Sequence, residues 1–252
     1  MLAKERLAYI VNRLKTRPSI SISELSKEMD VSFSTVKRDL CKLENEGMIE
    51  RSRGGAISNE VSEILSVNND IAVSEKISLN KNEKDVICKY ASELIKDGEC
   101  IFLDTGTTVA YIVPYIMNKQ ITIVTNSMYL QKQLYGCAGQ VYLLGGKYSD
   151  KYDMTMGSAT LMQLNSLSFD RAFISANGVN LKNKEVYSSQ SEIAEIKKLA
   201  LTRCKHSYLM VDRSKFDIKA IHTFAKTNDF ELIFTDDYPN KNKLLNNIKI
   251  CK

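Results

Sequence analysis

Six short apolar segments recur between residues 100 and 234, and each ends in small or polar residues before the next helical pattern begins. Repeated strand-then-helix units predict a mostly parallel sheet, because a parallel crossover needs a long connection, usually a helix. In such sheets ligands bind beyond the carboxyl ends of the strands. The pattern therefore predicts an α/β domain with a ligand-binding site at the carboxyl edge of its sheet. The predicted strands are residues 100–103, 121–124, 141–144, 171–175, 207–211 and 231–234.

Hydroxyl, amide and glycine residues stand at those predicted strand ends. The first strand runs directly into Asp104-Thr105-Gly106-Thr107-Thr108 and then into a helical run. A small-residue loop between a strand and a helix offers free backbone N–H groups to an anion. One such loop is a weak signal, since many are only turns, and this one lacks both the Walker ending and the GxGxxG spacing. Several strand ends together, with Lys215 as a positive charge for a phosphate, make a stronger case. The candidate effector-binding residues are Asp104, Thr105, Gly106, Thr107, Thr108, Thr125, Asn126, Gly145, Gly146, Asn177, Gly178 and Lys215.

The N-terminal part of the chain carries a different pattern, of three short amphipathic helices. The first, about residues 4–16, ends at Arg17-Pro18, because the residue before a proline is pushed out of the helical region. The second starts at Ser21, whose spacing to Glu24 is that of a capping box. The third, about residues 33–45, follows a tight turn. Two helices joined by a short turn are the framework of a helix-turn-helix.

Polar and basic side chains occupy the exposed side and the N-terminal end of the third helix, where a helix-turn-helix reaches base edges in the major groove. Residues 48–57 then predict a two-stranded hairpin with a glycine turn, whose arginines reach a neighbouring groove or the phosphate backbone. The alternative is a plain three-helix bundle with a solvated basic face, but here the cap, turn, basic helix and glycine wing occur in order. We therefore predict a winged helix-turn-helix in residues 1–57. The candidate DNA-binding residues are Ser34, Thr35, Lys37, Arg38, Arg51 and Arg53.

The stretch between the two patterns, residues 58–82, is rich in Ser, Asn and Glu and has weak periodicity. It predicts a linker, partly helical around Ile64 and Leu65, which leaves residues 83–252 as the effector domain. The formal net charge of +5 permits nucleic-acid binding without demanding it. No apolar run is long enough to span a membrane, and the first residues lack the apolar stretch of a signal peptide, so we expect a cytoplasmic protein.

The 6 cysteines show no CxxC spacing, and His206 and His222 lie near no such pair. We therefore expect neither a zinc site nor a disulfide framework. Most of the thiols are expected to be small core residues. No metal and no other cofactor is predicted.

Motifs along most of the chain match one known family. Its combination of pieces is specific, although no single piece is: Val31-Ser32-Phe33-Ser34-Thr35-Val36-Lys37-Arg38-Asp39-Leu40, Arg51-Ser52-Arg53-Gly54-Gly55-Ala56, Asp104-Thr105-Gly106-Thr107-Thr108, Val124-Thr125-Asn126-Ser127, Leu144-Gly145-Gly146, Met156-Gly157, Asp170-Arg171-Ala172-Phe173-Ile174 and Asp212-Arg213-Ser214-Lys215-Phe216. With these the sequence resembles the DeoR family of bacterial transcription regulators.

The resemblance implies a winged helix-turn-helix that binds DNA, followed by a domain similar in fold to ribose-5-phosphate isomerase that binds phosphorylated sugars. It further implies that ligand binding changes operator affinity and so controls sugar-metabolism genes. Lys37 and Arg53 stand where the family usually has Arg and His, which bears on the operator sequence. Lys76 stands where many relatives carry Arg, and Asn177 where many carry a small residue, which bears on the sugar phosphate that fits.

Three functional hypotheses follow. The first is a homo-oligomeric regulator, a repressor, that binds a double-stranded DNA operator under the control of a phosphorylated sugar. The second is a sugar-phosphate isomerase-like enzyme with a DNA-binding head. It needs a carboxylate base, and no paired acid–base signature selects one among Asp104, Glu185, Glu192 and Asp212, so no catalytic residue is assigned. The third is a DNA-binding protein whose sheet domain only oligomerises.

Overall fold

The computed structural model of the 252-residue chain describes residues 3–16, 19–45, 49–52, 55–58, 73–239 and 245–252. It divides into two compact units, Met1–Asn69 and Asp70–Lys252, each of which is described by itself. The boundaries that the sequence predicts, at residues 57 and 83, stay a prediction. The predicted helical stretch around Ile64 and Leu65 lies outside the described residues.

The smaller unit is a three-helix bundle completed by a three-stranded antiparallel sheet in the order β1-β3-β2. The capping box is confirmed, since the Ser21 hydroxyl accepts a hydrogen bond from Glu24 N at 3.1 Å and the Glu24 carboxylate accepts one from Ser21 N at 2.9 Å. Its fully buried core includes Ile10, Val36 and Leu40. Strand β1, which pairs with the wing, was not predicted. The elements are α1 (Ala3–Thr16), β1 (Ser19–Ser21), α2 (Ile22–Met29), α3 (Phe33–Asn45), β2 (Ile49–Ser52) and β3 (Gly55–Ser58).

The larger unit is built on a seven-stranded sheet in which every neighbouring pair is parallel, in the order β15-β14-β12-β9-β4-β5-β6. The predicted α/β fold with a mostly parallel sheet is thus confirmed, and all six predicted strands are present. Only the three-residue edge strand β15 was not predicted. The strands are β4 (Cys100–Leu103), β5 (Thr122–Thr125), β6 (Gln140–Leu143), β9 (Phe169–Ser175), β12 (Cys204–Met210), β14 (Leu232–Thr235) and β15 (Ile248–Ile250).

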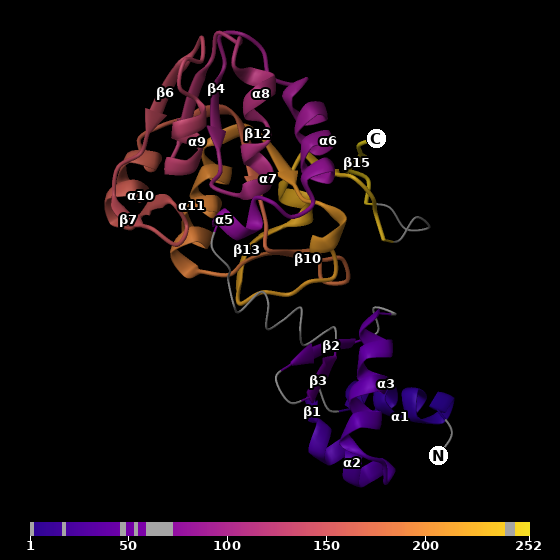
Figure 1. Ribbon diagram of the computed structural model, residues 1–252. Helices are drawn as coiled ribbons and strands as arrows, with labels where there is room; N and C mark the ends of the chain where they lie inside the picture. The colour runs from indigo at the N-terminus through magenta and orange to yellow at the C-terminus, as the bar shows by residue number, and fades with distance from the viewer. Residues whose placement is uncertain (1–2, 17–18, 46–48, 53–54, 59–72, 240–244) are drawn as a thin grey trace. The chain divides into compact units, whose positions relative to one another are not determined.

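Helices cover both faces of this sheet, which is why its strands are apolar on both sides (Figure 1). Along β4, Ile101 packs in one core with Ile87 of α6, while the next residue, Phe102, packs in the other with Ile196 of α11. One face carries α6 (Lys81–Ser92), α7 (Thr107–Ala110), α8 (Val113–Ile116) and α9 (Met128–Gln133), and the other carries α10 (Ser158–Asn165) and α11 (Ser191–Thr202).

Several short elements outside the seven-stranded sheet were not predicted from the sequence. They include a second antiparallel sheet in the order β10-β11-β13 and an antiparallel pair of β7 and β8. Their bounds are α5 (Val73–Lys76), β7 (Lys147–Ser149), β8 (Met154–Met156), β10 (Gly178–Asn180), β11 (Glu185–Ser188), η1 (Arg213–Lys215), β13 (His222–Lys226) and η2 (Thr227–Asp229).

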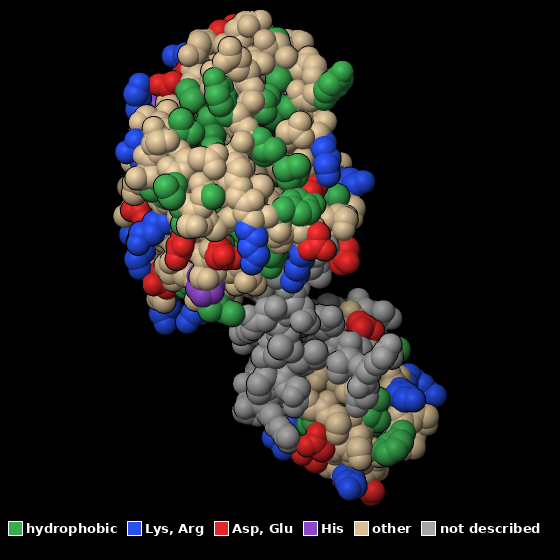
Figure 2. Space-filling model, turned by 90° about the vertical axis from the view of Figure 1, so that its left-hand side faces the viewer, with side chains coloured by type: hydrophobic (Ala, Val, Ile, Leu, Met, Phe, Trp, Pro, Cys, Tyr) green, Lys and Arg blue, Asp and Glu red, His purple; other side chains and the backbone are tan. Residues whose placement is uncertain are grey.

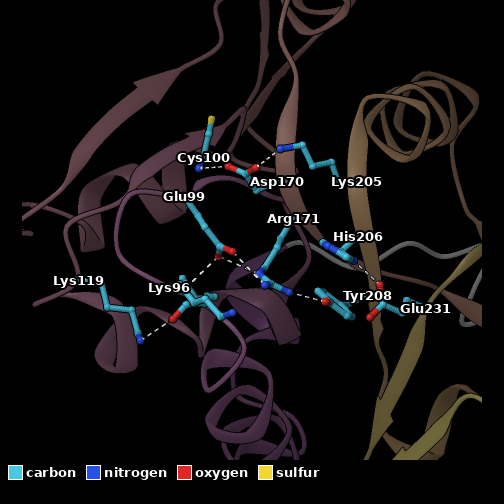
Figure 3. Close-up of polar contacts among 11 residues, drawn as sticks. Lys96, Glu99, Cys100, Lys119, Asp170, Arg171, Lys205, His206, Tyr208 and Glu231 are labelled. Atoms are coloured by element: carbon cyan, nitrogen blue, oxygen red, sulfur yellow. Dashed lines mark hydrogen bonds and ion pairs between the residues drawn. The ribbon is translucent and has the colours of Figure 1, made fainter.

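The amino ends of the strands carry a polar network (Figure 3). The Arg171 guanidinium of β9 donates to both carboxylate oxygens of Glu99, at 2.8 and 3.0 Å, and to the Tyr208 hydroxyl of β12 at 2.6 Å. Beside it, Asp170 accepts from the Lys205 ammonium at 2.8 Å and from Cys100 N at 2.9 Å. These contacts join the starts of three neighbouring strands, β4, β9 and β12.

Within the part of the chain that the structure describes, no helix has the length and apolar character to cross a bilayer. None of the six cysteines forms a disulfide. The expectation that most of them are core residues holds for Cys88 and Cys251 only, since Cys100, Cys137 and Cys204 are partly buried at the edges of the cores and Cys41 is exposed on α3.

Candidate functional site

A cavity of about 220 Å³ lies at the carboxyl ends of β4, β9 and β12. These three strands are neighbours in the sheet, so the loops that follow them meet. The loop after β4 brings residues 105–108, the loop after β9 brings residues 176–177, and the turn after β12 brings Asp212, Ser214 and Lys215. A further wall is the segment from α5 to the start of α6, residues 73–84, and the rest comes from Tyr152, Met154, Ser189, Ile193 and Lys197.

The floor of the cavity is organised by a buried ion pair between Asp104 and Lys197 of α11, which are 1% and 3% exposed. Ser175 donates to the same carboxylate through its N–H at 3.0 Å and its hydroxyl at 2.6 Å, and its carbonyl accepts from the Lys197 ammonium at 3.0 Å. Burial alone would raise the pKa of Asp104, but the charge of Lys197 and these hydrogen bonds outweigh it and lower that pKa. Asp104 is therefore an ionised anchor beneath the loop.

Gly106 packs against this anchor so closely that only glycine fits. A Cβ at this position would lie 1.8 Å from the Ser175 hydroxyl oxygen and 2.4 Å from its Cβ. The backbone of the loop can thus approach β9, which brings the hydroxyls of Thr107 and Thr108 to the cavity wall.

Four lysines line the cavity: Lys197 is paired with Asp104, and Lys76, Lys84 and Lys215 bring further positive charge. Lys84, at the start of α6, is 3% exposed, and its ammonium donates to the Lys76 carbonyl at 2.7 Å. Burial lowers the pKa of Lys84 to about 8; nearby Asp212 opposes this shift, and the charge of Lys215 adds to it. Among the described residues no acid forms an ion pair with Lys84 or Lys215. An anion would relieve the repulsion between these two ammonium groups.

Asp212, at the end of β12, is the one carboxylate among the described residues that line the cavity, and it is 2% exposed. Its Oδ1 accepts hydrogen bonds from Asn80 Nδ2 at 3.1 Å, from Ser214 N at 3.0 Å and from the Ser214 hydroxyl. Its Oδ2 is buried and has no hydrogen-bond partner in the described part of the chain. The site thus combines cations, hydroxyl donors and one unsatisfied acceptor.

The second candidate site is the exposed side of α3 in the smaller unit. Ser34, Lys37 and Arg38 are exposed and Thr35 is partly exposed, while Val36 points into the core. The Ser32 hydroxyl lies 2.8 Å from that of Ser34 and 3.0 Å from that of Thr35, which orders the first turn of α3. Asp39 is held by Arg6 of α1, with Nε 2.6 Å from Oδ2. The helix is thereby fixed with its polar side free to enter a groove.

Comparison with known proteins decides the family. Residues 6–62 match the family described as the DeoR-like helix-turn-helix domain, and residues 79–237 match the one described as the DeoR C terminal sensor domain. The chain belongs to the DeoR family. It is a DNA-binding transcription regulator, made of a helix-turn-helix domain and a sensor domain.

Curated relatives of this DeoR-family chain align over nearly their whole length. The uncharacterized HTH-type transcriptional regulator FruR of Bacillus subtilis is 31% identical over 94% of this chain and 92% of its own. The lactose phosphotransferase system repressor of Streptococcus mutans is 32% identical over 94% and 93%, and the repressor GlcR of Bacillus subtilis is 30% identical over 96% and 91%.

A solved ribose 5-phosphate isomerase, that of Methanocaldococcus jannaschii, aligns with 56% of each chain at 19% identity and a TM-score of 0.42. The sorbitol operon regulator SorC of Klebsiella pneumoniae aligns with 82% of this chain and 88% of its own at 12% identity and a TM-score of 0.36. At these scores neither likeness bears on function.

The structure brings half of the sequence-predicted effector residues to the cavity of this DeoR-family sensor domain. Those that line it are Thr105, Gly106, Thr107, Thr108, Asn177 and Lys215. The other half lie elsewhere: Asp104, Thr125, Asn126, Gly145, Gly146 and Gly178.

Each residue outside the cavity has a packing role instead. Thr125 and Asn126 are fully buried, where they donate to the Leu103 carbonyl at 2.8 Å and the Thr155 carbonyl at 2.7 Å. Gly145 and Gly146 follow β6, at the edge of the sheet, where a Cβ on Gly146 would lie 2.1 Å from the Thr160 hydroxyl. Gly178 lets β10 approach the Ile218 carbonyl, which a Cβ would meet at 2.5 Å.

Lys84 and Lys197 were missed as site residues, although the sequence carries a signal for each. Lys84 stands at helical spacing before the buried Ile87, Cys88 and Ala91. Lys197 stands at helical spacing from the buried Ile193, Ala194 and Ala200 on α11. A lysine on the apolar side of a helix is seldom fully buried without a partner, so it marks a polar site. Among the DNA-binding candidates, the side chain of Arg51, in β2, and the whole of Arg53 lie outside the described residues.

Proposed function

We propose that this chain is a repressor of sugar-metabolism genes whose operator affinity is set by a phosphorylated sugar bound in the cavity of the sensor domain. The observation that carries the proposal is the pair of lysines, Lys84 and Lys215, on a cavity lined by threonine hydroxyls at the carboxyl edge of a parallel sheet. The names of the lactose phosphotransferase system repressor and of GlcR support repression linked to sugar.

A route for the response follows from the cavity wall. Most of this wall, residues 73–82, falls within the stretch that the sequence predicts as a linker, and the Lys84 ammonium donates to the Lys76 carbonyl of the same stretch. A ligand that binds the Lys84 ammonium competes with the hydrogen bond from this ammonium to the Lys76 carbonyl, which is a contact that fixes the end of α5. Operator affinity then shifts by the difference in ligand affinity between the two states.

A homo-oligomer would place two recognition helices on repeated half-sites of a double-stranded operator. Strand β6, at one edge of the sheet, exposes Tyr142 and Leu143 and has no charged residue, and Tyr148 and Met162 are exposed nearby in the chain. Figure 2, turned to the side where β6, β7 and α10 lie in Figure 1, shows hydrophobic side chains gathered on this face of the larger unit. We propose this face for the contacts between subunits.

The test is binding of the purified full chain to its neighbouring promoter, with and without a panel of sugar phosphates. We expect at least one member to release the DNA. Lys215→Ala should keep DNA binding and lose most of the response, whereas Lys219→Ala, which removes an exposed charge four residues away, should respond normally. A Lys215→Ala protein with a full response would count against the site. The absence of any response would favour the hypothesis of a sheet domain that only oligomerises.

The isomerase-like alternative needs a base in the cavity, and of the four carboxylates considered above only Asp212 lines it. Asp104 is tied to Lys197 and Ser175, Glu185 lies on β11 with the Lys226 ammonium 3.1 Å from its carboxylate, and Glu192 is exposed on α11. Incubation with ribose 5-phosphate and a search for ketose product would test the alternative directly.

A further inference from the structure

The exposed side of α3 carries one aromatic side chain among its polar ones. The chain has 8 phenylalanines, and the other seven are at most 6% exposed, whereas Phe33, the first residue of α3, is 55% exposed. As far as the structure describes the smaller unit, neither its core nor the partly buried side chains packed against that core include Phe33. A single exposed hydrophobic residue is common on protein surfaces, so the position of Phe33 decides what it means.

Phe33 stands on the side of α3 that carries the candidate DNA-binding residues. Residues four apart lie on one face of a helix, so Phe33 lies one turn before Lys37, and Ser34 lies one turn before Arg38. All four side chains are exposed, and the first turn of α3 holds no acidic residue. In a helix-turn-helix the N-terminal residues of the second helix reach the base edges. An insertion of α3 that brings Lys37 and Arg38 to DNA therefore also brings the ring of Phe33 into the major groove.

Hydroxyl contacts fix the first turn of α3 and with it the position of Phe33. Ser32 caps the helix, since its hydroxyl accepts a hydrogen bond from Thr35 N at 3.3 Å. The same hydroxyl lies within hydrogen-bond distance of the hydroxyls of Ser34 and Thr35. No ring contact or cation–π contact among the described residues involves Phe33. The turn thus holds an aromatic ring at a defined place and leaves about half of its surface open to a partner.

The chemistry of the ring selects the group in DNA that it can recognise. A phenylalanine ring has no hydrogen-bond donor or acceptor of the kind that distinguishes the polar edges of the bases. The apolar group that the major groove presents is the 5-methyl of thymine, and Phe is among the side chains that contact it. Aromatic wedges between base steps belong to proteins that bind the minor groove, whereas an α-helix fits the major groove. Contact with the methyl group removes apolar surface of both partners from water.

We propose that Phe33 recognises thymine in the operator: its ring contacts the 5-methyl group in the major groove, while Lys37 and Arg38 contact phosphates or guanine. The inference depends on the entry of α3 into the groove and not on the effector of the sensor domain. Because the ring carries no charge, it contributes to discrimination between sequences and not to the salt-dependent attraction that the two basic side chains provide.

The experiment begins with duplexes that the purified full chain selects from a random-sequence library. In the selected duplex each thymine is replaced singly by deoxyuridine, which lacks the 5-methyl group and keeps the base pairing. The wild type should lose about three- to fivefold in affinity at one thymine of each copy of the recognised sequence, the loss expected for one methyl group that is no longer buried. Phe33→Ala should bind the unmodified duplex at least that much more weakly and lose nothing further with deoxyuridine. Its slope of log affinity against log salt should equal that of the wild type.

The matched control is Thr35→Ser. Thr35 lies in the same turn as Phe33, is partly exposed and carries a methyl group of its own, and the substitution removes that methyl but keeps the hydroxyl that contacts Ser32. This variant should keep the loss of affinity that deoxyuridine causes in the wild type. Phe33→Ser, a second variant without the ring, should behave as Phe33→Ala does, and the deoxyuridine series on the wild type does not depend on the folding of any variant.

A wild type that tolerates deoxyuridine at every thymine overturns the assignment, and so does a Phe33→Ala protein that shows the wild-type loss at the same thymine. A loss that disappears in Thr35→Ser assigns the contact to Thr35 and overturns it equally. In each of these cases DNA recognition by the chain stands. If no sequence is enriched from the library, the inference and the proposed repressor function fail together.

Discussion

Replacing Lys197 by Met should strongly destabilise the sensor domain. The variant keeps the length of the side chain but leaves the Asp104 carboxylate, 1% exposed, without its cation and with only Ser175 as a donor. Breaking a buried ion pair by removing one partner costs about 3–5 kcal/mol. For a unit of this size, Asp70–Lys252, each kcal/mol shifts the melting temperature by about 2–4 °C, so we expect a fall of roughly 6–20 °C.

The assay is thermal unfolding of the full chain followed by far-ultraviolet circular dichroism. Lys198→Met, which removes the exposed neighbouring lysine, should shift the transition by no more than about 2 °C. The double variant Asp104→Asn with Lys197→Met should recover much of the loss, because no unpaired charge then remains.

The pH dependence provides a sharper check. In the wild type the pKa of Asp104 is lower in the folded protein than in the unfolded chain, which stabilises the folded state at every pH above the ordinary carboxyl pKa. This stabilisation is lost as the pH falls below that pKa towards the lowered pKa of the folded state. Without Lys197, burial raises the pKa of Asp104, so the carboxyl of the variant protonates at a higher pH and its deficit should narrow between about pH 7 and pH 5. A deficit below about 1 kcal/mol, or one that is constant over this range, would refute the view that the ion pair holds the floor of the cavity.

Three further outcomes are expected. Gly106→Ala should abolish the effector response and spare DNA binding in promoter-binding assays, because its Cβ would lie 1.8 Å from the Ser175 hydroxyl. The control is Gly145→Ala, whose Cβ would have Gln163 Nε2 as its nearest neighbour at 3.4 Å. Equal responses of the two variants would contradict a role of the Gly106 loop in effector binding. Sugar-phosphate affinity measured by calorimetry should fall about tenfold from pH 7 to pH 9, because the pKa of Lys84 is about 8 and the ammonium loses its charge above that pH. Lys84→Gln should bind weakly at both pH values. A similar fall in affinity in that variant would mean that another group causes the pH dependence. Arg38→Ala should weaken binding to the promoter and, if Arg38 contacts a phosphate, reduce the slope of log affinity against log salt by about one; Lys89→Ala, an exposed lysine of the sensor domain, should leave both unchanged.

The strands and the DNA-reading helix could be predicted because their signals are local. Residues 33–45 form α3 as predicted, since Ser32 and the spacing of Val36, Leu40 and Leu43 act within one helix. The short antiparallel strands β10, β11 and β13 carry no such signal. They are only three to five residues long, and their pairing depends on segments far apart in the chain.

The site was predicted in part for a similar reason. Strand ends mark the functional edge of a parallel sheet, but the sequence does not say which ends are neighbours. In the structure β9 lies between β4 and β12, so the ends of the first, fourth and fifth predicted strands meet. Thr125 ends β5 and Gly145 follows β6, and both of these strands lie on the other side of β4. Lys84 and Lys197 come from helices, whose contribution to a strand-end site depends on the tertiary packing.

The network of Glu99, Arg171 and Tyr208 stabilises the sheet at a place distant from the cavity. With the contacts of Asp170 to Lys205 and Cys100 N, it joins the amino-terminal halves of β4, β9 and β12, while the cavity lies among the loops at their opposite ends. Substitutions in those loops can therefore retune which metabolite is recognised without loosening the alignment of the strands beneath. A sheet that is held together at the amino ends of its strands can therefore accept changes of sequence in the loops at their carboxyl ends.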